Sequence, residues 1–173
     1  MKPLYRLVMS LVVVSSLAAC GGSTPFSSPA GNFSVTFPAA PKEESQVLNT
    51  AIGAVTVHTF SCERGGRAYV VGYSDYPNFD NGVDKALDGA RDGAVNSSQG
   101  KLLSEEILSF EGHPAREIRL EMAQGLAMRL RLIAVGTRLY QVGVVTPRDE
   151  ASSPKIAEFL DTFHLSPGAR REG

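Results

Sequence analysis

The stretch that decides the fold runs from Ala115 to Thr146 and reads AREIRLEMAQGLAMRLRLIAVGTRLYQVGVVT. Apolar and polar residues alternate along it, a pattern typical of β-strands with one buried face. Two turn signals interrupt the alternation, Gln124-Gly125 and Gly136-Thr137, and the second matches a two-residue hairpin loop. The stretch therefore predicts three antiparallel strands joined as a β-meander, over 115–123, 126–134 and 138–146.

The alternation also predicts which side chains of the meander are buried. Ile118, Leu120 and Met122 are expected to face inward, and Tyr140, Val142 and Val144 share one face of the last strand. The outward positions are charged and could form a ladder of opposite charges across neighbouring strands. They are Glu117, Arg119, Glu121, Arg129 and Arg131.

Working outward, the same periodicity extends the sheet toward the N-terminus. A strand over 102–110 precedes the meander, and the earlier strands fall at 33–37, 42–49, 54–62 and 67–73. Between the two strand sets the period changes to that of a helix, with Asp80 or Asn81 as its cap and Gly100 as its stop. A second helix follows the last strand, with Ser153 as N-cap and Pro154 in the first turn.

This order of elements predicts the fold class. A meander, a helix, a second meander and a final helix give an α+β domain, in which an antiparallel sheet of two β-meanders is covered by two helices.

Several segments resemble small exported bacterial proteins that have a PsbP-like α/β/α sandwich. They are GNFSVTFPAAPK, YSDYP, GHPAREIRL, GTRLYQVGVVTP and FLDTFHL, which together cover nearly all of residues 31–165. The resemblance implies the fold. It implies no site residues, because the shared motifs are strands and turns, and the fold hosts photosystem accessory proteins and binding modules with different partners.

The N-terminal residues have the pattern of an export signal. Lys2 and Arg6 precede a short apolar run, and Leu17-Ala18-Ala19-Cys20 resembles the bacterial lipobox. That resemblance implies cleavage before Cys20 and attachment of fatty acyl chains, such as palmitate, to Cys20. Gly21 after the cysteine favours the outer membrane. The alternative is an ordinary secretory signal that happens to contain a cysteine.

The predicted organisation has four parts. Residues 1–19 are the lipoprotein signal peptide, 20–31 the lipid anchor and flexible Gly/Ser/Pro tether, 32–165 a single domain, and 166–173 a disordered tail. The predicted location is therefore the cell envelope, with the lipid on Cys20 as the link to the membrane.

Composition excludes some partners. The chain has 43% hydrophobic and 20% charged residues and a formal net charge of −1, so it lacks the basic excess that nucleic-acid binding requires. With Cys20 acylated, Cys62 has no partner cysteine. It is either a buried small apolar residue or a reactive thiol.

The sequence predicts no catalytic residues, no cofactor and no metal. Ser152 to Lys155 matches S-x-x-K, but Pro154 interrupts it and the partner motifs are missing. His58, His113 and His164 are widely spaced, and His58 and Cys62 are about 13 Å apart on an extended strand. The row Asp84, Asp88 and Asp92 is expected to be a solvated helix face.

One loop is the best candidate for contact with a partner. Tyr73, Asp75, Tyr76 and Phe79 combine aromatic and acidic residues between a strand and a helix. The alternative is that these rings cover the seam between helix and sheet. The function predicted is a non-enzymatic accessory or binding protein with an envelope protein as partner. A small-ligand or metal carrier and an unrecognised hydrolase are the alternatives.

Overall fold

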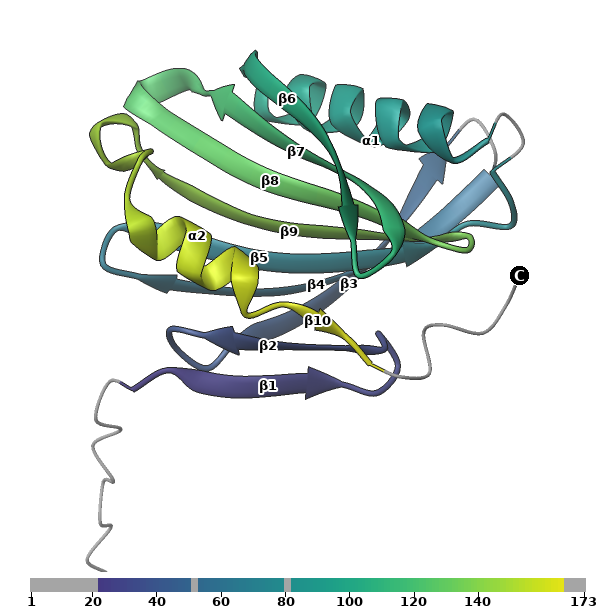
Figure 1. The fold of residues 1–173 in the computed structure, drawn as a ribbon, viewed down its shortest axis with the longest axis horizontal. Helices are drawn as coiled ribbons and strands as arrows, with labels where there is room; N and C mark the ends of the chain where they lie inside the picture. The colour runs from purple at the N-terminus through teal and green to yellow at the C-terminus, as the bar shows by residue number, and fades with distance from the viewer. Residues whose placement is uncertain (1–21, 51–52, 80–81, 167–173) are drawn as a thin grey trace, which may run out of the picture.

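The computed structural model describes residues 22–50, 53–79 and 82–166, which form two antiparallel sheets and two α-helices (Figure 1). The larger sheet has seven strands. In spatial order they are β3 (Lys42–Thr50), β4 (Gly53–Arg64), β5 (Arg67–Asp75), β9 (Arg138–Pro147), β8 (Leu126–Val135), β7 (His113–Glu121) and β6 (Lys101–Phe110).

The two predicted meanders are parts of this one sheet. Strands β3, β4 and β5 form the first and β6 to β9 the second, and β5 pairs with β9 with Tyr73 opposite Tyr140. The α+β class predicted from the sequence is confirmed. Each strand of the large sheet begins and ends within a few residues of its predicted bounds, because the alternation sets both the period and the length.

A second sheet of three strands lies against the large one. It consists of β1 (Thr24–Ser28), β2 (Phe33–Phe37) and β10 (His164–Leu165), and β2 is its central strand. The predicted flexible tether over 20–31 is therefore wrong for Thr24–Ser28, which pairs with β2. The reason is Phe26, whose ring centroid lies 4.9 Å from that of Phe60 in the core.

The C-terminal boundary also differs slightly from the prediction. The backbone N–H of Ser166, predicted as the first tail residue, donates to the carbonyl of Asn32. The predicted signal peptide, Cys20 and the rest of the tail lie outside the described residues.

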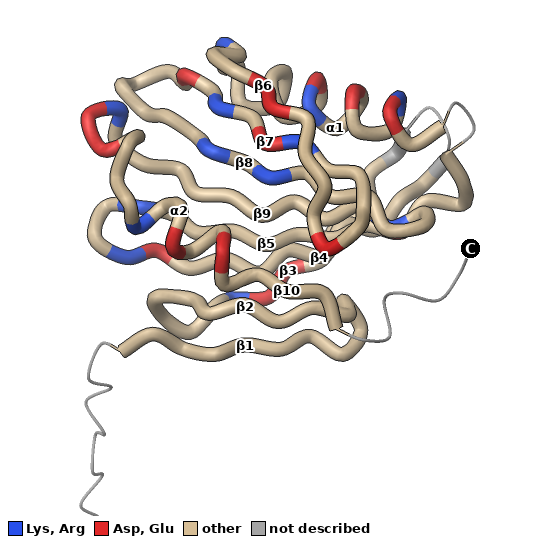
Figure 2. The backbone as a smooth tube through the Cα atoms, viewed as in Figure 1, with Lys and Arg blue, Asp and Glu red and all other residues tan. Residues whose placement is uncertain are grey.

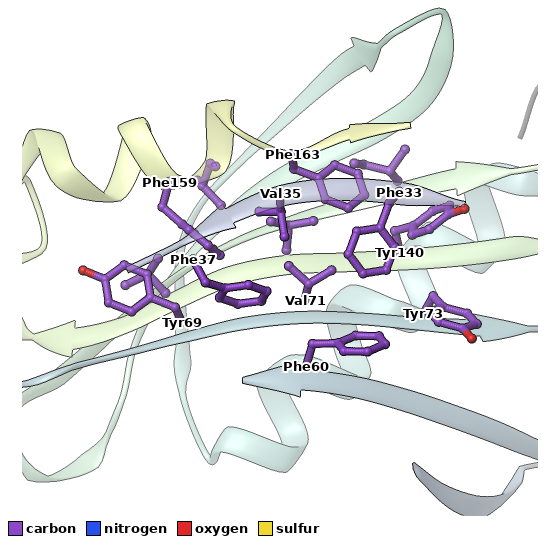
Figure 3. Close-up of a cluster of buried hydrophobic side chains, with 14 of the residues drawn as sticks. Phe33, Val35, Phe37, Phe60, Tyr69, Val71, Tyr73, Tyr140, Phe159 and Phe163 are labelled. Carbon is purple, nitrogen blue, oxygen red and sulfur yellow. The ribbon is translucent and has the colours of Figure 1, made fainter. Parts of the chain in front are cut away.

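The first core lies between the large sheet and the layer formed by the small sheet and α2 (Pro154–Asp161) (Figure 1). It is rich in aromatic rings, and Figure 3 shows Phe33 and Tyr140 within it, with Phe163 beside them. The fully buried Tyr140 hydroxyl donates to the Gly31 carbonyl at 2.7 Å. This bond ties the connection between β1 and β2 to the large sheet.

The second core lies on the opposite face of the large sheet, under α1 (Val83–Ser98). Leu87 of α1 is 1% exposed and packs against leucine and isoleucine side chains of β7, β8 and β9. The predicted caps Asp80 and Asn81 lie outside the described residues. The helix ends at Ser98, slightly before the predicted stop, with Gln99 in the left-handed conformation and the Gly100 N–H bonded to the Val95 carbonyl.

Charged residues lie on both helices and along much of the large sheet, including α1, β6, β7 and β8, while β1 and β2 carry none (Figure 2). The expectation that Glu117 faces outward is wrong, because it is only 7% exposed. Arg129 Nε donates to Glu117 Oε1 at 2.5 Å, and Arg131 Nη2 donates to Glu117 Oε2 at 3.0 Å. Arg131 also donates to the Leu160 carbonyl of α2, which helps to cover this site.

The charge on Glu117 is favoured by its neighbours. Burial acts to raise its pKa, but hydrogen bonds from Arg129 and Arg131 outweigh burial, and the pKa of Glu117 lies below its usual value. A depressed carboxylate pKa contributes stability above the unfolded-state value of about 4.3, and this stability is lost as the pH falls through the folded-state value.

We expect Glu117→Gln to lower the free energy of unfolding by about 1–3 kcal/mol at pH 7, because two arginines lose their carboxylate. The difference from wild type should shrink as the pH falls from about 4.3 toward 3. Urea unfolding between pH 3 and 7 measures both quantities. Glu158→Gln, on the exposed side of α2, serves as the control and should change little at any pH. An unchanged difference across this pH range would contradict the assignment.

Candidate functional site

Helix α1 lies off the centre of its sheet face. It packs over β7 and β8, where Leu87 enters the core, and it is also held by ion pairs. Arg116 of β7, itself buried, donates to Asp88 Oδ1 at 2.5 Å and to Glu105 Oε1 at 2.6 Å. Arg91 Nη1 donates to Glu105 Oε2 at 2.9 Å. These contacts hold α1 toward β6 and β7, on one side of the sheet.

The position of α1 leaves a groove over the other side. The groove has a volume of about 790 Å³ and lies between α1 and strands β3, β4, β5 and β9. One wall is α1, with small residues at every turn, and the opposite wall is the edge strand β3. The lining comprises Gln46, Leu48, Val57, Thr59, Ser74, Tyr76, Asn78, Phe79, Gly82, Lys85, Ala86, Gly89, Ala90, Gly93, Ala94, Ser97, Leu139 and Gln141.

The strand register builds the floor of the groove. Val57 of β4 lies opposite Ser74 of β5, which in turn lies opposite Leu139 of β9. In the next row, Thr59 and Gln141 lie on either side of Gly72. Hydroxyl and carboxamide groups therefore alternate with aliphatic side chains across the floor.

The polar groups of the floor are available for a ligand. Ser74 is only 2% exposed, and within the described residues its hydroxyl has no hydrogen-bond partner. The Thr59 hydroxyl and the Gln141 carboxamide also have no hydrogen-bond partner among the described residues, and both side chains are partly exposed. Because buried polar groups are normally hydrogen-bonded, this arrangement indicates a surface that water or a ligand satisfies.

The four loop residues predicted to contact a partner divide between two faces. Tyr76 and Phe79 line the groove, with ring centroids 5.7 Å apart, and both pack against the core under α1. They cover the seam between helix and sheet and also face the groove, so both interpretations of them apply. Their contact with a partner stays a prediction.

Tyr73 lies on the opposite face of the sheet, which corrects its placement at the site. It is 5% exposed, stacks on His58 with centroids 4.6 Å apart, and lies under the Arg138 guanidinium at 4.7 Å. Burial raises the pKa of the Tyr73 phenol. Asp75 accepts hydrogen bonds from Arg138 Nε at 2.6 Å and Nη2 at 2.7 Å. Tyr73 points from β5 into the aromatic core. Tyr76 follows the end of β5 at Asp75 and packs on the opposite face, under α1.

Gly89 and Gly93 of α1 correct an expectation from the sequence, which is that such small residues let the helix approach the sheet closely. Gly89 and Gly93 are one turn apart and line the groove, and a Cβ added at either would meet nothing within 4 Å. Packing against the sheet therefore does not require glycine at either position. A signal was present, since glycine inside an amphipathic helix is costly, but it did not distinguish close packing from an open wall.

The groups considered for chemistry lie apart from one another. His58, His113 and His164 belong to β4, β7 and β10, and the described residues contain no group of three or more His, Cys, Asp or Glu side chains that could hold a metal.

The other residues considered for chemistry have structural surroundings. Cys62 is buried, and burial raises the pKa of its thiol. Ser153 is the N-cap of α2, as predicted. Asp88 is more than a solvated residue, because it binds Arg116.

Across residues 22–50, 53–79 and 82–166, neither helix has the length and apolar character needed to cross a bilayer.

We expect Gly89→Ala and Gly93→Ala each to raise the free energy of unfolding by about 0.5–1 kcal/mol, because alanine favours the helix and no neighbour obstructs its Cβ. Chemical denaturation monitored by circular dichroism measures the change. Gly100→Ala is the matched control. Its Cβ would lie 2.8 Å from Ser98 Oγ and 3.1 Å from the Glu121 carbonyl, so it should destabilise. Loss of stability on alanine substitution at position 89 or 93 would show that the wall is packed.

Comparison with known proteins identifies the fold. No protein-family model matches the chain, and no curated protein matches it. The chain is similar to the solution structure of cyanobacterial PsbP (CyanoP) from Synechocystis sp. PCC 6803, with a TM-score of 0.58, 14% identity, and coverage of 86% of this chain and 95% of that chain. A crystal structure from Bacteroides thetaiotaomicron matches with a TM-score of 0.42, 17% identity, and coverage of 85% of this chain and 50% of that chain, which is too weak to carry an argument. The chain therefore has a PsbP-like fold.

Proposed function

We propose that this chain is a non-enzymatic binding or accessory protein of the cell envelope, held to a membrane by lipid on Cys20, that recognises its partner in the groove beside α1. The observation that carries the proposal is the groove itself, in which unpaired hydroxyl and carboxamide groups lie next to a helix wall of mostly glycine and alanine residues. Sites that recognise ligands combine an apolar lining with a few polar groups in this way.

The composition of the groove supports binding rather than hydrolysis. Its lining contains no histidine, cysteine, aspartate or glutamate among the described residues. The described lining therefore offers the Ser74 hydroxyl no histidine or carboxylate as a general base, and a serine without a base is a weak nucleophile. The likeness to CyanoP agrees with an accessory role, but at 14% identity it supports the fold and not the function.

The proposed anchor is compatible with an accessible groove. Cys20 precedes the first residue of β1, Thr24, by four positions, which span at most about 14 Å of chain. The small sheet that contains β1 covers the face of the large sheet opposite α1 (Figure 1). A lipid at Cys20 would therefore hold the domain close to the bilayer from the side away from the groove.

A small-ligand carrier is the second candidate. The groove volume of about 790 Å³ falls in the range of sites that enclose small molecules, roughly 300–1,000 Å³.

For the anchor, we expect Cys20→Ser to move the protein from the membrane fraction to the soluble fraction, because attachment of lipid requires the thiol. Fractionation followed by immunoblotting measures this change. Cys62→Ala removes the other cysteine and should leave the protein in the membrane. Membrane retention of the Cys20→Ser protein would refute lipid anchoring.

For the groove, we expect a photo-crosslinking amino acid at position 89 to capture an envelope protein in living cells, whereas the same residue at Asn96 should not. Both positions are exposed on α1, but only Gly89 lines the groove. Electrophoresis and mass spectrometry identify the adducts. A small molecule in native mass spectra, without a protein adduct, would favour the carrier. The absence of both a crosslinked protein and a bound small molecule would refute a binding function for the groove.

A further inference from the structure

We infer that the groove binds an extended peptide segment of six or seven residues that is uncharged except for a carboxylate at the Gly82 end of α1. This inference rests on the proposed function and names the class of partner. Four properties of the groove support it: its length, its open helix wall, its polar floor and its charge.

The length of the groove matches a short extended chain. Lining residues on α1 run from Gly82 to Ser97, so the wall is about 22 Å long at 1.5 Å per residue. An extended peptide advances about 3.3 Å per residue, and six or seven residues cover that length. A compact small molecule would occupy only part of the wall.

The helix wall allows a main chain to approach closely. Gly89 and Gly93 present bare backbone one turn apart, with no atom within 4 Å of where a Cβ would stand. Ala86, Ala90 and Ala94 continue the same face with short side chains. A bound backbone could lie along this wall without displacing any side chain.

The floor offers the hydrogen-bonding groups that a peptide needs. Each peptide unit presents one donor and one acceptor. The Gln46 and Gln141 carboxamides and the Thr59 and Ser74 hydroxyls can each donate and accept, and Ser74 is directed into the groove while 98% of its surface is buried. Aliphatic side chains between them, including Leu48 and Leu139, supply apolar contacts for alternate side chains of the peptide.

The charge of the groove selects the sequence of the peptide. Lys85, in the first turn of α1, is the one charged residue among the described lining. The positive end of the helix dipole lies at the same end, so both favour a carboxylate there. The acidic residues of α1 do not line the groove, and Asp88 is engaged by Arg116. The C-terminal segment of this chain does not match the expected ligand, because it contains Arg170 and Arg171, whereas the groove favours a negatively charged peptide end.

The test uses the full acylated protein in detergent and a synthetic library of fluorescein-labelled random heptapeptides, with binding measured by fluorescence polarisation. We expect the selected peptides to have Asp, Glu or a free carboxyl group near one end and no Lys or Arg. Shortening them to four residues should weaken binding by about tenfold or more. Lys85→Glu should reverse the preference at that end to Lys or Arg.

Variants of the wall connect this binding to the groove. Gly93→Phe should weaken the selected peptides by about tenfold or more, and Gly89→Leu should act in the same direction, while the exposed Asn96→Phe should bind like wild type. Circular dichroism and urea unfolding of each variant identify any loss that comes from misfolding.

Some outcomes would overturn the peptide inference and leave the proposed function intact. One is that no heptapeptide binds better than a Gly-Ser heptapeptide while the crosslinker at position 89 still captures a protein or a small molecule co-purifies. A second is that the Gly93→Phe and Gly89→Leu variants both bind the selected peptides as tightly as wild type. A third is the selection of basic peptides such as the chain's own C-terminal segment. Failure of peptides, crosslinks and co-purified ligand together would overturn both proposals.

Discussion

The pairing of β5 with β9 is the interaction on which the rest of this structure depends. It joins two meanders that are separated in the chain by α1 and makes a single seven-stranded sheet. Without it, each meander would expose an additional strand edge, which sheets normally cover or pair. The close approach of β9 to its other neighbour, β8, is made possible by Gly143, where a Cβ would lie 2.8 Å from Leu130 Cδ1. The paired strands then supply side chains to both faces of the sheet.

The two faces obtained in this way have different roles. On one face, Tyr73 and Tyr140 enter the aromatic core that binds the small sheet and α2. On the other, Ser74 and Gln141 face the groove. One strand pair therefore connects the buried aromatic core to the open groove, and a well-packed support is what positions a binding surface accurately.

Electrostatics determines where the groove opens. Arg116 is almost fully buried and is neutralised by Asp88 and Glu105, which connects α1 to the β6–β7 edge. A buried ion pair contributes little net stability, because desolvation offsets much of the attraction, but these pairs fix the contact between α1 and the β6–β7 edge. Here the selected arrangement places α1 to one side of the sheet. The ion pairs hold the helix toward β6 and β7, and the floor of the groove beside it is left to uncharged side chains of β4, β5 and β9.

The sequence by itself determined the strands of the large sheet, the two helices and the face of β7 that packs under α1. Alternation and helical spacing are local properties, and burial imposes them on every element. Only the tertiary structure decided what covers each face. Glu117 occupies an outward position of the pattern and is nevertheless buried, because Arg129 and Arg131 pair with it and α2 approaches from far along the chain. Phe26 brings a Gly/Ser/Pro-rich segment into the fold as β1, although its neighbours have the composition of a linker. The groove combines Gln46, Gly89 and Gln141 from three distant segments. Sequence periodicity predicts whether a residue is buried or exposed. It does not predict which element buries the residue, because strand order and helix position are set by contacts between distant parts of the chain.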